Sequence, residues 1–342
     1  MMAQTGLSFE PLQIHAAEEA ERIQSAIRDI LFGQVRRRGV VLGLSGGIDS
    51  SVVAALCMCA LGRERVLGLF MPESDSADES LRLGKLLAGS LGIATVIEDI
   101  SPILSAAGCY RRRDEAIRWL VPEYGEGWKC KLVLADLNSA ARYTIPSLVV
   151  QAPGGEQTKI RLSAQAYSQI VAATSFKQRT RKMLEYYHAD RLQYAVVGTP
   201  NRLEYDQGFF VKNGDGAADL KPLAHLYKSQ VYQLAAYLGV PLEIQQRPST
   251  SDTYSLPQSQ EEFYFSLPLD QMDICLYGKN QGLLPDVVAR ATGLTVEQVE
   301  RVYAAIESKR KATRYLRLSP VLVEPIDGNA TTEPALATGE RA

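Results

Sequence analysis

Val40-Val41-Leu42-Gly43-Leu44-Ser45-Gly46-Gly47-Ile48-Asp49-Ser50-Ser51 is the stretch of sequence that decides the fold. Its apolar run predicts a strand buried on both faces, and the polar residues after the glycine pair predict the first turn of a helix. Free backbone N–H groups and the positive end of the helix dipole meet at such a turn, where glycines and serine hydroxyls favour a bound anion. The stretch therefore predicts a phosphate site at the carboxyl end of a buried strand.

Asp49 indicates which kind of phosphate site this is. A carboxylate repels a phosphate unless a cation lies between them, so Asp49 predicts bound Mg²⁺. The loop lacks the Gly-Lys-Ser/Thr of a Walker A motif. The alternative interpretation is an ordinary tight connection between a strand and a helix, which a lone glycine pair would favour and this longer string disfavours.

Composition and charge exclude several classes of function. The 342 residues are 46% hydrophobic and 22% charged, as in ordinary globular proteins, and the net charge of −2 gives no indication of nucleic acid as a partner. No signal sequence or membrane-length apolar run is found, which predicts a cytoplasmic protein with no membrane partner. The five cysteines, an odd number without paired metal spacing, are expected to be reduced.

The order of predicted elements indicates an α/β fold. Strands alternate with helices after the opening strand, which predicts a doubly wound, Rossmann-like parallel sheet whose ligands bind at the carboxyl ends of the strands. A helix is expected at 17–35, strands at 65–71, 94–100 and 194–198, and further helices at 77–91, 164–188 and 226–238. The C-terminal part is expected to be helical, most clearly at 285–291 and 295–308.

The pattern breaks between about residues 102 and 163. Within this segment, 147–152 and 157–162 flank a Pro-Gly-Gly turn and predict a β-hairpin. A lone hairpin cannot bury enough surface to fold alone, so the segment is interpreted as an insertion into one domain that spans 17–312. Residues 1–16 and 320–342 are expected to be weakly ordered tails.

Charged and polar stretches outside the opening loop indicate further parts of a binding site. Four cations fall within six residues of the predicted helix at 164–188, which favours a phosphate clamp over a merely solvated helix face. Residues 206–219 and 247–262 are polar, lack an apolar stripe and are expected to be mobile. Glu204 follows the fourth strand, at another carboxyl-end loop.

Four motifs make the chain resemble the ammonia-dependent NAD synthetases, a family of N-type ATP pyrophosphatases with the adenine nucleotide alpha hydrolase-like fold. The resemblance covers about residues 20–312 apart from the insertion. The first motif is shared with all ATP pyrophosphatases, whereas the last resembles NAD synthetases alone. The motifs are Ser45–Ser50, Lys177–Arg181, Gly198-Thr199 with Glu204, and Gly208–Leu223.

The resemblance implies a reaction and its partners. In the family, nicotinic acid adenine dinucleotide attacks the α-phosphate of ATP, pyrophosphate leaves, and ammonia displaces AMP from the acyl adenylate to give NAD⁺. It also implies Mg²⁺ and a homodimer. The chain shows no glutaminase domain, which implies free ammonia or a separate ammonia donor.

The resemblance also implies roles for individual residues. Mg²⁺ would be held by Asp49 and Glu204, and the catalytic residues would be Asp49, Lys212 and Lys228. The ATP site would comprise Ser45, Gly46, Gly47, Asp49, Ser50, Met71, Thr199, Lys228 and Thr250. The dinucleotide site would comprise Phe176, Arg179, Lys212, Asp219 and Glu262, with Phe176 stacking on the pyridine ring.

Two departures from the family pattern keep alternatives open. Residues 248–253 read Pro-Ser-Thr-Ser-Asp-Thr where many members have Pro-Ser/Thr-Ala-Asp-Leu, and Ser308 stands where members commonly have histidine. One alternative is an amide-forming ligase of the same type that acts on a different carboxylic acid. The other is a nucleotide-binding subunit without turnover, which the joint presence of Asp49, Glu204, Lys212 and Lys228 disfavours.

Overall fold

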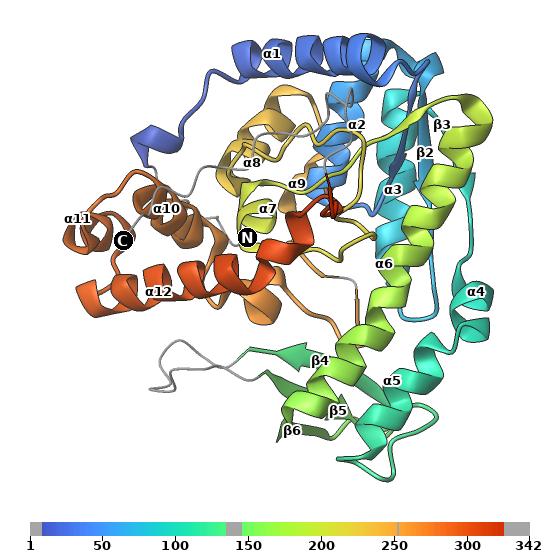
Figure 1. Cartoon of the computed structure of the whole chain (residues 1–342), viewed down its shortest axis with the longest axis vertical. Helices are drawn as coiled ribbons and strands as arrows, with labels where there is room; N and C mark the ends of the chain where they lie inside the picture. Colours follow the sequence, from blue (N-terminus) through green and yellow to red (C-terminus); the bar gives the residue numbers. More distant parts are fainter. Residues whose placement is uncertain (1–8, 135–145, 252, 325–342) are drawn as a thin grey trace.

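A four-stranded parallel sheet forms the centre of the molecule (Figure 1). The computed structural model describes residues 9–134, 146–251 and 253–324. The strand order is β3-β2-β1-β7, so the chain runs outward from β1 to β3 and then returns to the other side of β1. This reversal confirms the doubly wound fold. The strands are β1 Val40–Gly43, β2 Val66–Phe70, β3 Ala94–Ile97 and β7 Ala195–Val196.

Alternate residues of β1 face opposite layers of helices. Val40 and Leu42 pack into the core cluster formed with α1, α2, α3 and α8, whereas Val41 packs against the cluster on the side of α6. All three side chains are fully buried, and burial of each contributes roughly 1.5–3 kcal/mol. The helices of the two layers are α1 Ala16–Arg28, α2 Ile48–Leu61, α3 Asp78–Leu91, α8 Lys228–Tyr237, α9 Leu242–Gln246, and on the other face α4 Ser101–Ala106 and α6 Ala164–Leu192.

The inserted segment forms a second, antiparallel sheet at the far end of α6 (Figure 1). The hairpin of β5 Ser147–Gln151 and β6 Gln157–Arg161 is confirmed. Two elements of this segment were not predicted from the sequence, β4 Lys129–Val133 and α5 Cys109–Arg118. The strand β4 pairs with β5 in antiparallel orientation. The buried side of this sheet packs on α5 and the first turns of α6, so the inserted sheet shares its core with a helix of the main fold.

The C-terminal helices form a separate cluster beside the main sheet (Figure 1). Residues 9–15, expected as part of a weakly ordered tail, pack here instead: Leu12 is 3% exposed and Phe9 contacts Tyr277 edge-on. Residues 1–8 and 325–342 of the expected tails lie outside the described residues. The helices are α7 Arg202–Gln207, α10 Leu269–Asn280, α11 Pro285–Thr292 and α12 Val296–Thr313.

Short helical turns complete the chain. The helix expected at 17–35 ends at Arg28 and continues as a π-helical turn, η2, because its backbone hydrogen bonds shift by one residue. Within the described residues, no helix is both long and apolar enough to span a membrane. The remaining turns are η1 Glu10–Leu12, η2 Asp29–Val35, η3 Arg63–Arg65, η4 Glu261–Phe265 and η5 Arg314–Arg317.

Candidate active site

The loop between β1 and α2 lies at the point where the strand order reverses, beside the end of β7. Gly46 has a φ of +71°, and a Cβ there would lie 2.4 Å from the carbonyl oxygen of Ser80 in α3. Only glycine fits both restrictions. The tight packing of the loop on α3 therefore explains Gly46, and Gly47 forms the N-cap of α2.

The serine hydroxyls of this loop are already engaged with one another and with the backbone. The Oγ atoms of Ser50 and Ser51 donate to the carbonyl oxygen of Gly47 at 3.1 and 2.8 Å, and Ser45 Oγ lies 3.1 Å from Ser50 Oγ. Ser51 is fully buried, whereas Ser45 is exposed. Ser45 and the N–H groups of the loop are thus the donors best placed for a phosphate.

Asp49, in the first turn of α2, joins a buried polar cluster with residues from α7 and α8. Lys228 Nζ donates to Asp49 Oδ2, and Asn201 Nδ2 donates to Asp49 Oδ1 at 3.0 Å. Glu204 Oε2 accepts from the backbone N–H of Asn201 at 3.1 Å, and Glu204 Oε1 accepts from Gln260 Nε2 at 2.9 Å. We call these five residues the Asp49 cluster.

The electrostatics of the Asp49 cluster are those of two carboxylates that share one cation. Burial, and then the charge of Asp49, raise the pKa of Glu204 to about 8. Burial of Lys228 opposes its charge, but Asp49 and Glu204 outweigh that effect and raise its pKa. Glu204 therefore holds its proton near neutral pH, and the charge of Asp49 is balanced by Lys228.

Asp49 and the buried Glu204 are the two carboxyl groups against which a magnesium site can be tested. Carboxylate oxygens from separate elements suit Mg²⁺, which commonly takes one or two carboxylates together with substrate phosphates. In the described part of the chain, no three His, Cys, Asp or Glu side chains gather into a possible metal cluster. Asp49 and Glu204 thus fit a shared metal–phosphate site and not a closed protein cage.

A cavity of about 180 Å³, the first cavity, opens between the β1 loop and α6. The ends of β1 and β2 line one side, including Ser45 and Met71, and Arg181 Nε donates to the carbonyl oxygen of Met71 at 3.3 Å. Lys182 Nζ pairs with Glu185 at 2.5 Å in the α6 wall, and burial raises the pKa of Glu185. The cavity thus combines an apolar strand end with a charged helix face.

A second cavity, of about 320 Å³, lies between α6, the segment after β7 and residues 250–264. Six aromatic side chains line it, with Phe209 stacked on Tyr264 at a centroid distance of 4.5 Å, and the wall also includes Glu204 and Lys309. An aromatic wall with a few charged groups suits a heteroaromatic, charged ligand.

The two cavities share a wall. Gln178, Thr199, Asp215 and Ser251 line both of them. Asp215 Oδ1 accepts from the backbone N–H of Val211 at 2.7 Å, and burial raises the pKa of its carboxyl group. The two cavities therefore adjoin at these four residues.

Lys309, in the second cavity, provides a prediction about pH. Its Nζ donates to the carbonyl oxygen of Tyr264 at 2.6 Å, and burial lowers its pKa to about 7. The unfolded chain holds this proton up to about pH 10.5, so the contribution of Lys309 to stability rises from pH 7 toward pH 10. We expect the stability of Lys309→Met, relative to the wild type, to fall between pH 7 and 9, by at most about 1.4 kcal/mol per pH unit.

Urea unfolding at pH 7, 8 and 9 measures this difference. Lys311→Met, which removes an exposed lysine from the same helix, controls for the loss of one positive charge. If the free energy of unfolding of Lys309→Met relative to the wild type stays constant or rises between pH 7 and 9, the lowered pKa of Lys309 is contradicted.

Only some cations of the predicted phosphate clamp on α6 line a cavity. Arg181 and Lys182 line the first cavity, but Arg179 is exposed and its Nε donates to the carbonyl oxygen of Lys212 at 3.2 Å. Lys177 is 0% exposed and ion-paired with protein carboxylates, so it cannot bind a phosphate. A 29-residue helix that is buried on several sides separates cations that are close in sequence. Phe176 packs on the apolar cluster below the sheet and lines neither cavity.

Three other expected dinucleotide contacts also lie outside the two cavities. Asp219 Oδ2 accepts from the backbone N–H of Val196, which ties it to the edge of β7. Lys212 Nζ donates to the carbonyl oxygen of Tyr315 at 2.8 Å, and Glu262 pairs with Lys131 at 2.7 Å on an open surface. Thr250, expected at ATP, lines the second cavity and not the first.

Both segments expected to be mobile are held by contacts in the structure. Gly214 and Gly216 donate to the carbonyl oxygen of Val211, and Gln260 donates to the carbonyl oxygen of Ser249 at 2.9 Å. Asp252 in the second segment lies outside the described residues.

Asn201, Gln260 and Lys309 are cavity or cluster residues that were not predicted from the sequence. Asn201 had a readable signal, because Asn three residues before Glu predicts a capping box, and the structure has one here. Gln260 and Lys309 reach the site from distant segments, and their spacing carries no comparable signal.

Comparison with known proteins identifies relatives of the whole chain. A family model described as NAD synthase matches residues 19–118 and 153–315, well over half of the chain. The NH₃-dependent NAD⁺ synthetase of Rhizobium meliloti (strain 1021) is 62% identical over 320 residues, which cover 94% of this chain and 96% of the relative. That of Rhizobium rhizogenes (strain K84) is 59% identical over 322 residues, with 94% and 97% covered.

A solved structure supports the fold. The NH₃-dependent NAD synthetase of Campylobacter jejuni superimposes with a TM-score of 0.59 at 22% identity, over 91% of this chain and 100% of that chain. The family model leaves out residues 119–152, which lie inside the expected insertion of about 102–163 and include all of β4 and β5.

Proposed function

This chain belongs to the NAD synthase family, and we propose that it makes NAD⁺ from ATP, ammonia and nicotinic acid adenine dinucleotide. The acceptor carboxylate attacks the α-phosphate of ATP, pyrophosphate leaves, and ammonia then displaces AMP from the acyl adenylate. No covalent bond to the protein forms, so the protein contributes by positioning the substrates and stabilising charge.

The observation that carries this proposal is the wall shared by the two cavities. ATP fits the first cavity, with its adenosine toward Met71 and its phosphates toward the loop after β1. The acceptor fits the second cavity, where Thr250 and the aromatic side chains lie. The α-phosphate and the carboxylate then meet near Thr199, which lines both cavities.

The Asp49 cluster is proposed to act on the phosphates. Asp49 and Glu204 would hold Mg²⁺, and the bound ion would supply positive charge for the pyrophosphate. Lys228 is oriented by Asp49 and supplies a buried positive charge at the same place. Ser45, Gly46, Gly47 and Ser50 present N–H and hydroxyl donors to the phosphates.

The remaining expected acceptor contacts require movement or a second subunit. Arg179 and Lys212 lie outside both cavities in this structure, and Arg179 is exposed on α6. Met183 and Tyr187 follow it at intervals of four residues and are 54% and 59% exposed. We propose that this face of α6 belongs to a homodimer interface; sedimentation of a monomer at micromolar concentration would argue against it.

Two further proposals concern the domain and its location. Residues 17–312 form one synthetase domain, with the segment of about 102–163 as its insertion. The protein works in the cytoplasm on free ammonia or on ammonia from a separate donor, which is consistent with five unpaired cysteines and with ATP as substrate.

A substrate panel tests the proposed function. With ATP, Mg²⁺ and nicotinic acid adenine dinucleotide, we expect ammonium chloride to give NAD⁺, AMP and pyrophosphate in equal amounts. Glutamine alone should give no product. Pyrophosphate release with another carboxylic acid, and none with this dinucleotide, would support the alternative ligase, whereas ATP binding without turnover would indicate a non-catalytic subunit.

A further inference from the structure

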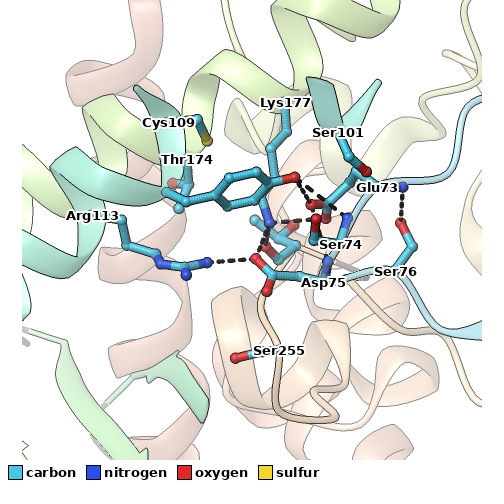
Figure 2. A network of polar contacts seen from close by, with 12 residues as sticks. Glu73, Ser74, Asp75, Ser76, Ser101, Cys109, Arg113, Thr174, Lys177 and Ser255 are labelled. Carbon is cyan, nitrogen blue, oxygen red and sulfur yellow. Dashed lines mark hydrogen bonds and ion pairs between the residues drawn. The ribbon is translucent and has the colours of Figure 1, made fainter. Parts of the chain in front are cut away.

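The charged side chains of a buried ion-pair network line neither of the two cavities (Figure 2). Its centre is Lys177 of α6, which is fully buried. Lys177 Nζ contacts Glu73 Oε1 at 2.9 Å, Asp75 Oδ2 at 2.6 Å and the carbonyl oxygen of Thr253 at 2.8 Å. These three partners use all three donors of the ammonium group.

The second layer of the network fixes the two carboxylates. Tyr110 Oη donates to Glu73 Oε2 at 2.8 Å, and Arg113 Nη1 contacts Asp75 Oδ2 at 2.5 Å. Lys177 and Arg113 thus balance the charges of Glu73 and Asp75 within the protein. Arg113 also pairs with Asp114 at 2.8 Å, and Lys177 has no donor left for a ligand, so the role of Lys177 must lie in what it connects.

The network connects one segment of each cavity. Glu73 and Asp75 belong to the segment after β2, whose residues 71, 72, 76 and 77 line the first cavity. Thr253 belongs to the segment whose residues 250, 251, 253 and 254 line the second cavity. Lys177 is therefore hydrogen-bonded to both segments at once.

The contact with Thr253 is the part of this connection that other side chains support least. Glu73 and Asp75 are each held by a second side chain, but Thr253 is bonded through its backbone, and its hydroxyl donates only to the nearby carbonyl oxygen of Ser251. A charge-assisted hydrogen bond in a buried environment depends steeply on distance. A small shift of the segment after β2 therefore moves Lys177 relative to Thr253.

We propose that Lys177 is a positioning residue that holds Thr253 against the segment after β2, so that nucleotide in the first cavity orders the wall of the second. The inference rests on the proposed function only in requiring ATP in the first cavity. It assigns Lys177 no contact with a substrate.

The test compares two variants that each break the network. Lys177→Met removes the contact with Thr253, whereas Arg113→Met removes a buried cation from Asp75 and leaves the Lys177–Thr253 contact in place. Both variants lose a buried ion pair, so loss of stability alone affects both. Only the first separates the two cavity segments.

The readout needs no acceptor and no turnover. Hydrogen exchange of residues 249–254 is measured with and without Mg²⁺ and α,β-methylene-ATP. In the wild type and Arg113→Met we expect the nucleotide to slow exchange, and in Lys177→Met we expect no change. In turnover assays, Lys177→Met should raise KM for the acceptor at least about tenfold while KM for ATP stays within about twofold.

Three outcomes separate the claims. If the wild type does not bind the nucleotide by calorimetry, the proposed function fails. If the wild type binds it and residues 249–254 respond equally in both variants, or not at all in the wild type, the positioning role is wrong. If Lys177→Met does not fold, Lys177→Arg, which keeps the charge beside Glu73 and Asp75, replaces it and should show a reduced response; a wild-type response would overturn the proposal.

Discussion

We expect Asp49→Asn to lose at least about a thousandfold in kcat/KM, which corresponds to roughly 4 kcal/mol of transition-state stabilisation. The amide fills the same space and can still accept a hydrogen bond from Asn201, but it has no charge to hold Mg²⁺ or orient Lys228. Steady-state rates of pyrophosphate release at saturating Mg²⁺ measure the effect.

Asp99→Asn is the matched control for this variant. Asp99 is exposed and accepts a hydrogen bond from the backbone N–H of Ser101, and asparagine caps a helix equally well. We expect near-normal rates for the control. Rates within tenfold of the wild type for Asp49→Asn would contradict the proposed metal role of this carboxylate.

The second large effect is expected for Lys228→Met. Removing the buried ammonium leaves the carboxylates of Asp49 and Glu204 without a cation, which costs about 3–5 kcal/mol of stability. Mg²⁺ should restore part of this loss, so the Tm of the variant should rise with Mg²⁺ more than that of the wild type. We expect kcat to fall about a hundred- to a thousandfold even in saturating Mg²⁺.

Lys279→Met gives the comparison for Lys228→Met. Lys279 pairs with Glu307 at 3.6 Å near the surface, where removal of one partner costs at most about 1 kcal/mol. Thermal unfolding with and without Mg²⁺ compares the two variants. An equal Mg²⁺ response in Lys228→Met and the wild type would show that Lys228 does not share its carboxylates with a metal.

Local sequence patterns were enough to predict the main sheet. The apolar run at Val40 and the later strands alternate with helices, so their order follows from rules on parallel sheets. The strand β4, Lys129–Val133, was missed because it is only five residues long and nothing in its sequence indicates that it pairs with β5. Local sequence patterns do not show which segments pair with each other, as β4 does with β5.

The site residues that could be predicted are those that follow directly after a predicted strand in the sequence. Asp49 and Glu204 follow strand ends, and the topology brings such ends together. Phe176 and Lys177 lie away from both cavities, because a pattern of cations and aromatics on a helix does not indicate which neighbouring element each side chain contacts. The elements that cover α6 include α5 and residue 253, and these come from other parts of the chain.

The central claim is that the two cavities bring the α-phosphate of ATP to the acceptor carboxylate. Dinucleotide labelled with ¹⁸O at both carboxylate oxygens, converted with ammonia and analysed by mass spectrometry, tests it directly. The account predicts that one labelled oxygen appears in AMP and the other remains in the amide of the product. Label in inorganic phosphate, with ADP as the second product, would show attack at the γ-phosphate and contradict the account.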